Sequence, residues 1–187
     1  MTHRNSGCLV VVVGPSGSGK DSLLHAAKAH FSLHEHVQFV KRVITRECDP
    51  QSEIHDSVTH EEFLVQKQQG AFSIWWQANG LYYGLPASVH TQLNAGKLLI
   101  VNGSRAAIPE FRQRFTELAI VSVNSSASVL AERLTRRNRE SHDDILKRLQ
   151  RNERLAPLSG SDVTHIENNG ELAVATSEFI ETLNTLL

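Results

Sequence analysis

The stretch Gly14–Asp21, GPSGSGKD, follows the apolar run Cys8–Val13 and decides the fold of this chain. A glycine-rich turn that ends in lysine, between a buried strand and a helix, typically holds nucleotide phosphates through its backbone N–H groups. The glycines allow backbone conformations that other residues resist, and the positive end of the following helix dipole favours an anion. We therefore expect ATP to bind at Gly14, Pro15, Ser16, Gly17, Ser18, Gly19 and Lys20.

The last position of this loop departs from the general pattern, which ends in a serine or threonine hydroxyl that ligates Mg²⁺. Asp21 stands there, and Ser22 follows it. A carboxylate is a good ligand for Mg²⁺, directly or through water, whereas one helical step turns Ser22 about 100° away. We include both residues in the nucleotide site and expect Asp21 to be the metal ligand. The alternative is that Asp21 is only a favourable acid in the first helical turn.

The composition is that of an ordinary soluble domain. The 187 residues fit one domain, 40% of them are hydrophobic, and the formal net charge is −1. No global basic field would draw the chain to nucleic acid or to a membrane surface, so neither partner is expected. The apolar run at the start is too short for a signal peptide or a spanning helix, which favours a cytoplasmic protein. The oligomeric state stays open, with a homodimer as one possibility.

Apolar runs alternate with helical patterns along the chain. This alternation predicts an α/β fold with a parallel sheet flanked by helices, in which ligands bind at the carboxyl ends of the strands. Thr59–Glu62 is a capping-box pattern, and Pro86 suits the first turn of a short helix. The expected strands are Cys8–Val13, Val37–Thr45, Phe72–Ala78, Leu98–Asn102, Leu118–Val123 and Val163–Glu167.

Several segments together resemble guanylate kinases. They are GPSGSGKDSLL from Gly14, Thr45–Arg46, Glu53–His55, Glu61–Phe63, Gly80–Gly84, Glu132–Leu134 and Ile145–Leu149. The resemblance implies a P-loop NTPase fold in one kinase domain. It divides the chain into a core of about residues 1–35 and 89–187, a small acceptor-binding lobe of about 36–88, and a helical lid of about 135–145.

The departures from guanylate kinases fall in the acceptor half. Asp49 stands about where a second arginine is expected, no tyrosine follows Glu53–His55, and Val101–Arg105 lacks an acidic residue. These oddities, with the GKD ending of the loop, resemble the ribose 1,5-bisphosphate phosphokinases of phosphonate utilisation. That resemblance implies transfer of the ATP γ-phosphate to a small phosphorylated sugar, giving phosphoribosyl diphosphate. The alternatives are a guanylate or other nucleoside monophosphate kinase, and a non-catalytic interaction module.

Phosphoryl transfer needs cations more than a base, because the enzyme mostly positions groups and neutralises charge. The resemblance assigns that catalytic role to Lys20, Arg133, Arg137 and Arg148, and it places Asn168 near the adenine. The alternative for Arg133 is stacking on the adenine ring.

A doubly phosphorylated acceptor needs two anion sites and groups that bind sugar hydroxyls. We expect Arg46, Tyr83 and Arg105 to bind phosphate and Asn102, Asp49 and Glu53 to bind the sugar, the alternative for several of them being simple hydrogen bonding within loops. Trp75 and Trp76 must face opposite sides of a strand, so one belongs to the core and the other is free to line the acceptor pocket.

Overall fold

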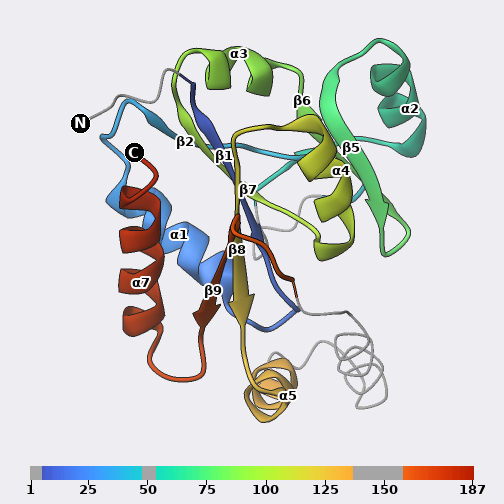
Figure 1. Ribbon diagram of the computed structural model, residues 1–187. Helices are drawn as coiled ribbons and strands as arrows, with labels where there is room; N and C mark the ends of the chain where they lie inside the picture. Colours follow the sequence, from blue (N-terminus) through green and yellow to red (C-terminus); the bar gives the residue numbers. More distant parts are fainter. Residues whose placement is uncertain (1–5, 48–53, 137–157) are drawn as a thin grey trace.

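The computed structural model describes residues 6–47, 54–136 and 158–187, which form two sheets with helices around them (Figure 1). The larger sheet is parallel, in the order β2-β7-β1-β8-β9, and it confirms the expected P-loop kinase architecture of a parallel sheet flanked by helices. Its strands are β1 (Cys8–Val13), β2 (Val37–Phe39), β7 (Leu98–Asn102), β8 (Leu118–Asn124) and β9 (Val163–Glu167). Within the described residues, no helix is long and apolar enough to cross a membrane.

The smaller sheet is mixed and comes from the middle of the chain. Its order is β4-β3-β6-β5, with β3 parallel to β4 and antiparallel to β6. The strands are β3 (Val43–Ile44), β4 (Asp56–Ser57), β5 (Phe72–Ala78) and β6 (Leu81–Pro86). The helices in the part of the chain that the structure describes are α1 (Lys20–His30), α2 (His60–Gln68), α3 (Ser88–Asn94), α4 (Ile108–Arg114) after the 3₁₀ turn Arg105–Ala107, α5 (Ala127–Arg136) and α7 (Leu172–Asn184).

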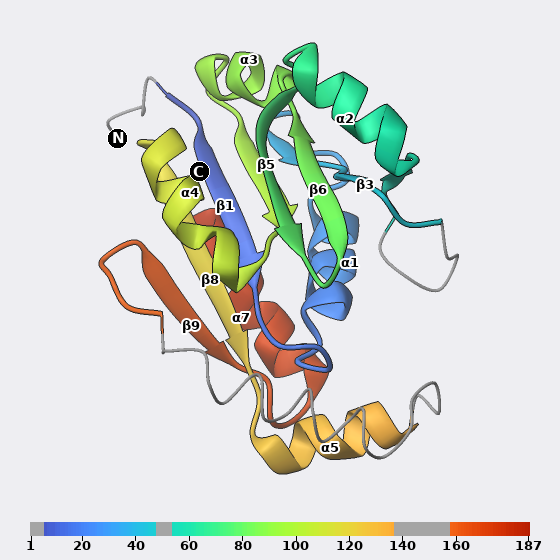
Figure 2. The same cartoon turned by 90° about the vertical axis from the view of Figure 1, so that its right-hand side faces the viewer.

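The two faces of β1 belong to two separate hydrophobic clusters, because successive side chains of a strand point to opposite sides. Val10 and Val12 face α1 and α7, where Phe179 is fully buried. Val11 and Val13 face α4 and the smaller sheet, which cover the other side (Figure 2). Each helix or sheet buries its apolar face against β1, so β1 must be apolar throughout, as its sequence is.

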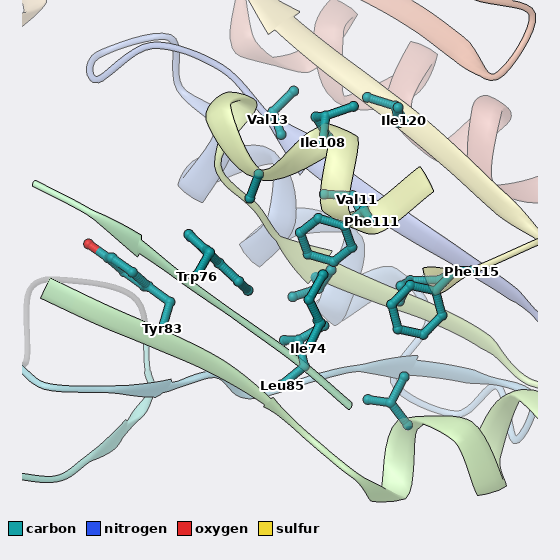
Figure 3. Packing of buried hydrophobic residues seen from close by; sticks show 14 of the residues in the cluster. Val11, Val13, Ile74, Trp76, Tyr83, Leu85, Ile108, Phe111, Phe115 and Ile120 are labelled. Atoms are coloured by element: carbon teal, nitrogen blue, oxygen red, sulfur yellow. The ribbon is translucent and has the colours of Figure 1, made fainter. Parts of the chain in front are cut away.

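An aromatic column joins α4 to the smaller sheet. The ring of Phe111 packs against Trp76 with centroids 5.4 Å apart, and Trp76 stacks on Tyr83 at 5.5 Å and 7°. Figure 3 shows Trp76 between the other two rings, with the Tyr83 hydroxyl pointing away from Phe111. Trp76 is buried and Trp75 is 36% exposed, so the expectation that they face opposite sides is confirmed.

Two sequence-based expectations about local structure were wrong. The predicted strand Val37–Thr45 is interrupted, because the chain leaves the larger sheet after β2 and enters the smaller sheet at β3. Pro86 does not begin a helix: it is the last residue of β6, opposite Phe72 at an irregularity in the pairing with β5, where its missing N–H is tolerated, and α3 starts at Ser88. The capping box at Thr59 is confirmed by reciprocal bonds with Glu62, which also lower the pKa of the Glu62 carboxyl.

A bidentate ion pair connects the segment before β9 to α4. The Arg112 guanidinium donates to both carboxylate oxygens of Asp162 at 2.8 Å and to the Ser159 carbonyl at 2.9 Å. These hydrogen bonds hold the pKa of Asp162 below its usual range. The contact fixes the entry to β9, whose carboxyl end leads to Asn168.

We expect Phe111→Ala to lower the free energy of unfolding by about 3–5 kcal/mol, since it removes the fully buried ring at the base of the aromatic column. Urea unfolding followed by circular dichroism measures this. The control is Leu33→Ala at a 95% exposed position, for which we expect a change within about 0.5 kcal/mol. Similar losses for the two variants would contradict the structure's core.

Candidate active site

The loop of residues 14–19 lies at the carboxyl end of β1 and is shaped by two glycines in the left-handed region. Gly17 has φ 90° and Gly19 has φ 86°, conformations that L side chains resist. Gly19 is also the residue before α1, and no side chain caps this helix. The first N–H groups of a helix have no partner within it. The amino end of α1, which begins at Lys20 and has no side-chain cap, therefore suits a phosphate group. This is the ligand that the sequence of the loop predicts.

Three residues from distant parts of the chain hold this loop. The Asn168 amide donates to the Ser18 carbonyl at 2.8 Å, and Ser125 Oγ donates to the Asn168 carbonyl at 2.8 Å. Arg133 Nη1 lies 3.3 Å from Ser125 Oγ and 3.5 Å from the Gly17 carbonyl. The described contacts of Asn168 are thus with the loop and β8, and they give it a positioning role. Arg133 belongs to α5, and its side chain reaches the loop at Gly17.

Asp21 is bound to the end of a neighbouring strand. The Asn102 amide at the end of β7 donates to Asp21 Oδ1 at 3.1 Å. Asp21 is exposed, while Asn102 is 6% exposed. The structure thus brings together two residues that the sequence predicted for different tasks, the metal and the sugar. The bond leaves the second carboxylate oxygen of Asp21 available in a solvent-accessible position, a suitable ligand for a hydrated Mg²⁺.

The expected acceptor residues come from both sheets: Arg46 and Tyr83 from the smaller one, and Asn102 and Arg105 from the end of β7 and the turn after it. Arg46 follows β3 and is exposed, and its carbonyl accepts hydrogen bonds from His55 at 3.2 Å and from Ser57 Oγ. Tyr83 is buried in the aromatic column, and its hydroxyl points away from Phe111. Arg105 begins the 3₁₀ turn after β7, and partial burial lowers the pKa of its guanidinium, which stays charged at neutral pH.

Four expected site residues, Asp49, Glu53, Arg137 and Arg148, lie outside the described residues, as does most of the expected lid. The remaining ones lie at different places. Asn168 and Arg133 contact the loop, Asp21 is bonded to Asn102, and Lys20 follows the loop at the start of α1. Arg105 lies in the turn after β7, and Arg46 and Tyr83 belong to the smaller sheet. Within the part of the chain that the structure describes, no group of three or more histidine, cysteine, aspartate or glutamate residues could hold a metal by itself.

Sequence reasoning missed two residues at this site. One is Ser125, whose hydroxyl donates to the Asn168 carbonyl and lies 3.3 Å from Arg133 Nη1. The other is Arg42, which is buried with its guanidinium carbon 5.0 Å from the centroid of the Tyr83 ring. A signal for Arg42 was present: Arg42, Ile44 and Arg46 alternate, so in an extended chain they share one face, and Ile44 is in the core.

Two solved structures with a similar fold are a guanylate kinase and a gluconokinase. A guanylate kinase from Anaplasma phagocytophilum superposes with a TM-score of 0.67, covering 96% of this chain and 86% of that protein at 16% identity. A gluconokinase from Sinorhizobium meliloti gives a TM-score of 0.56 at 20% identity, covering 98% and 94%. These likenesses show the fold, which, with the lysine-bearing glycine loop, is that of P-loop kinases.

The sequence relatives narrow this class. A ribose 1,5-bisphosphate phosphokinase from Rhizobium etli is 44% identical over all of this chain and 98% of its own length. One from Agrobacterium fabrum is 45% identical over 94% of this chain and 95% of its own, and one from Pseudomonas fluorescens is 40% identical over 90% of both. No protein-family model matches the chain. The chain belongs to the ribose 1,5-bisphosphate phosphokinase family of phosphotransferases, as the sequence resemblance predicted.

We expect Gly19→Ala to weaken ATP binding by about tenfold or more, the loss typical of charge-assisted hydrogen bonds. A Cβ at Gly19 would lie 2.3 Å from Asn168 Nδ2, so the loop and its support cannot keep their present geometry. The control is Gly96→Ala, which has a similar φ of 75° but open space around its Cβ. Titration calorimetry with ATP should separate the two variants, and equal affinities would contradict the assigned role of the loop.

Proposed function

We propose that this protein transfers the γ-phosphate of ATP to the 1-phosphate of ribose 1,5-bisphosphate, forming 5-phosphoribosyl 1-diphosphate in phosphonate utilisation. The observation that carries this proposal is the identity of 44–45% with ribose 1,5-bisphosphate phosphokinases over nearly the whole of each chain. The guanylate kinase alternative is supported only by a structural similarity at 16% sequence identity, which is evidence for the fold and not for the acceptor.

The residues present suit this reaction because it needs charge neutralisation and alignment. The accepting phosphate is already an anion at neutral pH, so no strong base is required. Lys20 and the N–H groups at the start of α1 hold the β- and γ-phosphates in line with the acceptor. Arg133, at the loop, stabilises the charge that develops on the transferred group as the bond to ADP breaks, with Arg137 and Arg148 proposed for the same task.

The acceptor is proposed to bind between the loop and the smaller sheet. Arg46 and Arg105 take its phosphates, and the Tyr83 hydroxyl donates to a phosphate oxygen. Asn102 orients a sugar hydroxyl while its amide group stays on Asp21. Asp49 and Glu53 are proposed to bind further sugar hydroxyls. We further propose a cytoplasmic location, where ATP and sugar phosphates meet.

Magnesium is proposed as the metal, held by Asp21 with waters in the remaining positions. When bound, Mg²⁺ would neutralise negative charge on the β- and γ-phosphates. The structure fits this assignment in one respect: Asp21 is exposed at the amino end of α1, and Asn102 fixes its carboxylate there. The alternative, that Asp21 is only a favourable acid in the first helical turn, does not account for its hydrogen bond to Asn102.

The acceptor assay tests the proposal directly. Purified protein is incubated with ATP, Mg²⁺ and either ribose 1,5-bisphosphate or GMP, and ADP release is followed by a coupled enzyme assay. We expect turnover with the sugar bisphosphate and little with GMP. The product is identified by its use in a phosphoribosyltransferase reaction. Fast turnover of GMP with none of the sugar would replace the proposal with the guanylate kinase alternative.

We expect Asp21→Ser to keep ATP binding and to shift the magnesium concentration that gives half-maximal rate, since a neutral hydroxyl replaces a charged ligand. Asp21→Asn is the matched variant, which keeps the shape and the pairing group but removes the charge. Both should shift the Mg²⁺ dependence in the same direction. If magnesium titrations of both variants coincide with that of the parent protein, Asp21 is not the metal ligand.

A further inference from the structure

The helix α5 carries Arg133 to the loop of residues 14–19, but it lies outside the main hydrophobic core. In Figures 1 and 2 it extends beyond the carboxyl ends of β8 and β9, away from the helices that cover the larger sheet. Of its described side chains, Leu130 and Leu134 are buried, and a Cβ at Gly17 would lie 3.4–3.5 Å from them. Among the described residues, the two clusters around β1 include neither leucine. The position of α5 therefore depends on its contact with the loop and on how its first turn is attached.

Asn169 attaches this first turn to the bend between β9 and α7. The N–H of Ser126, the residue before α5, donates to Asn169 Oδ1 at 2.7 Å, and the Ser126 hydroxyl caps the helix at the Val129 N–H, 3.4 Å away. In a capping box the third helical residue would accept the N–H of the capping residue, as Glu62 does for Thr59 in α2. Val129 stands at that position in α5 and has no acceptor in its side chain. Asn169 supplies the missing acceptor from another part of the chain.

The Asn169 side chain is itself oriented by Glu167. Asn169 Nδ2 donates to Glu167 Oε2 at 3.3 Å, and Glu167 Oε1 accepts from the Asn124 amide at 3.1 Å. Asn124 ends β8, and Ser126 follows two residues later, so these contacts close a ring that joins β8, β9 and the start of α5. A carboxylate accepts hydrogen bonds and cannot donate them, so Glu167 selects the amide nitrogen and leaves the amide oxygen for Ser126.

Two adjacent asparagines after β9 thus contact different parts of the nucleotide site. Asn168 is buried, and its amide donates to the loop at the Ser18 carbonyl. Asn169 is exposed, and its amide oxygen accepts the N–H at the start of α5. Arg133, whose guanidinium lies 3.5 Å from the Gly17 carbonyl, is about 10 Å farther along the helix. A tilt of about 10° at the first turn would move Arg133 by about 2 Å, which is large for a group that aligns with reacting atoms.

We propose that Asn169 is a positioning residue for Arg133, acting through the backbone of Ser126 and the first turn of α5. The inference rests on the proposed function, in which Arg133 stabilises charge on the transferred phosphoryl group. Asn169 offers no group to ATP or to the acceptor. Its loss therefore removes an alignment that matters in the transition state and leaves the support of the loop by Asn168 in place. Such a change lowers kcat more than it lowers the affinity for ATP.

The experiment measures kcat with ribose 1,5-bisphosphate and the dissociation constant of ATP, the latter by calorimetry, in Asn169→Ala and in the parent protein. We expect kcat to fall by about 3- to 10-fold, the loss for one hydrogen bond, and the dissociation constant to change by less than about twofold. Asn168→Ala is the contrasting variant, whose main effect should be weaker ATP binding. Asn184→Ala is the control, at the exposed last residue of α7, and should change neither quantity. An unchanged kcat in Asn169→Ala, or an equal loss of ATP affinity, would overturn the proposal.

A double-mutant cycle tests whether Asn169 acts through Arg133. Arg133→Met removes the cation that is to be aligned, so Asn169→Ala should cause no further loss of kcat in that background. Turnover of radiolabelled ATP detects the slow rates of these variants. Losses that multiply independently would overturn the proposal, because Asn169 would then act by another route. A purely structural role would lower the melting temperature of Asn169→Ala equally in both backgrounds.

An exchange of donor and acceptor tests the contact with Glu167. Asn169→Asp keeps an oxygen for the Ser126 N–H but places a second carboxylate against Glu167, so kcat should fall. Adding Glu167→Gln supplies an amide donor to that carboxylate, and kcat should recover toward the value of the parent protein. A combined variant as slow as Asn169→Ala would overturn the role assigned to this contact.

A measurement without substrates separates this proposal from the function on which it rests. If the parent protein fails to phosphorylate ribose 1,5-bisphosphate, the proposed function is wrong. The cycle of Asn169→Ala and Arg133→Met is then measured by urea unfolding of the free protein, since the contacts of Arg133 with the loop are present without a ligand. Losses of stability that are not additive support the positioning of Arg133 by Asn169, and additive losses overturn it.

Discussion

The amino end of α1, left without a side-chain cap, is the constraint on which the rest of the structure depends. Its N–H groups and Lys20 create a strongly positive site for phosphate. This site forms only if the preceding loop keeps the left-handed conformations of Gly17 and Gly19. The Asn168 amide, 150 residues away in the sequence, secures that path at the Ser18 carbonyl. The order of strands in the larger sheet places β9 so that its end reaches the loop, and the Arg112–Asp162 pair fixes the start of that strand.

Both faces of β1 must be covered by apolar side chains before this arrangement is stable, and different elements cover the two faces. One face carries α1 and α7 and supports the loop. The other carries α4 and the smaller sheet, which pack against it through apolar side chains. The smaller sheet is thereby fixed relative to the strand that leads into the loop of residues 14–19.

The sequence predicted the features that depend on neighbours in the chain. The strand, loop and helix of residues 8–30, the capping box and the opposite faces of Trp75 and Trp76 follow from local chemistry and from the period of two in a strand. It did not predict the break in Val37–Thr45, because both halves favour a strand and only the tertiary structure decides that they enter different sheets. The contacts Asn168–Ser18 and Asn102–Asp21 were also not predicted, because only the tertiary structure brings together residues that are 150 and 81 positions apart.

The aromatic column of Phe111, Trp76 and Tyr83 also has a consequence for the intrinsic fluorescence of the protein. Indole emission responds to the local electric field, and the two tryptophans occupy different fields: Trp75 lies at the surface with the Lys67 ammonium 3.6 Å from its ring centroid, and Trp76 lies in the interior, one ring away from the Arg42 guanidinium. The two indoles therefore report on different sides of the smaller sheet, Trp75 on its exposed side and Trp76 on the side that packs against Phe111. Loss of the packing between Trp76 and Phe111 is expected to change the intrinsic emission of the protein, so that this contact can be followed without a label.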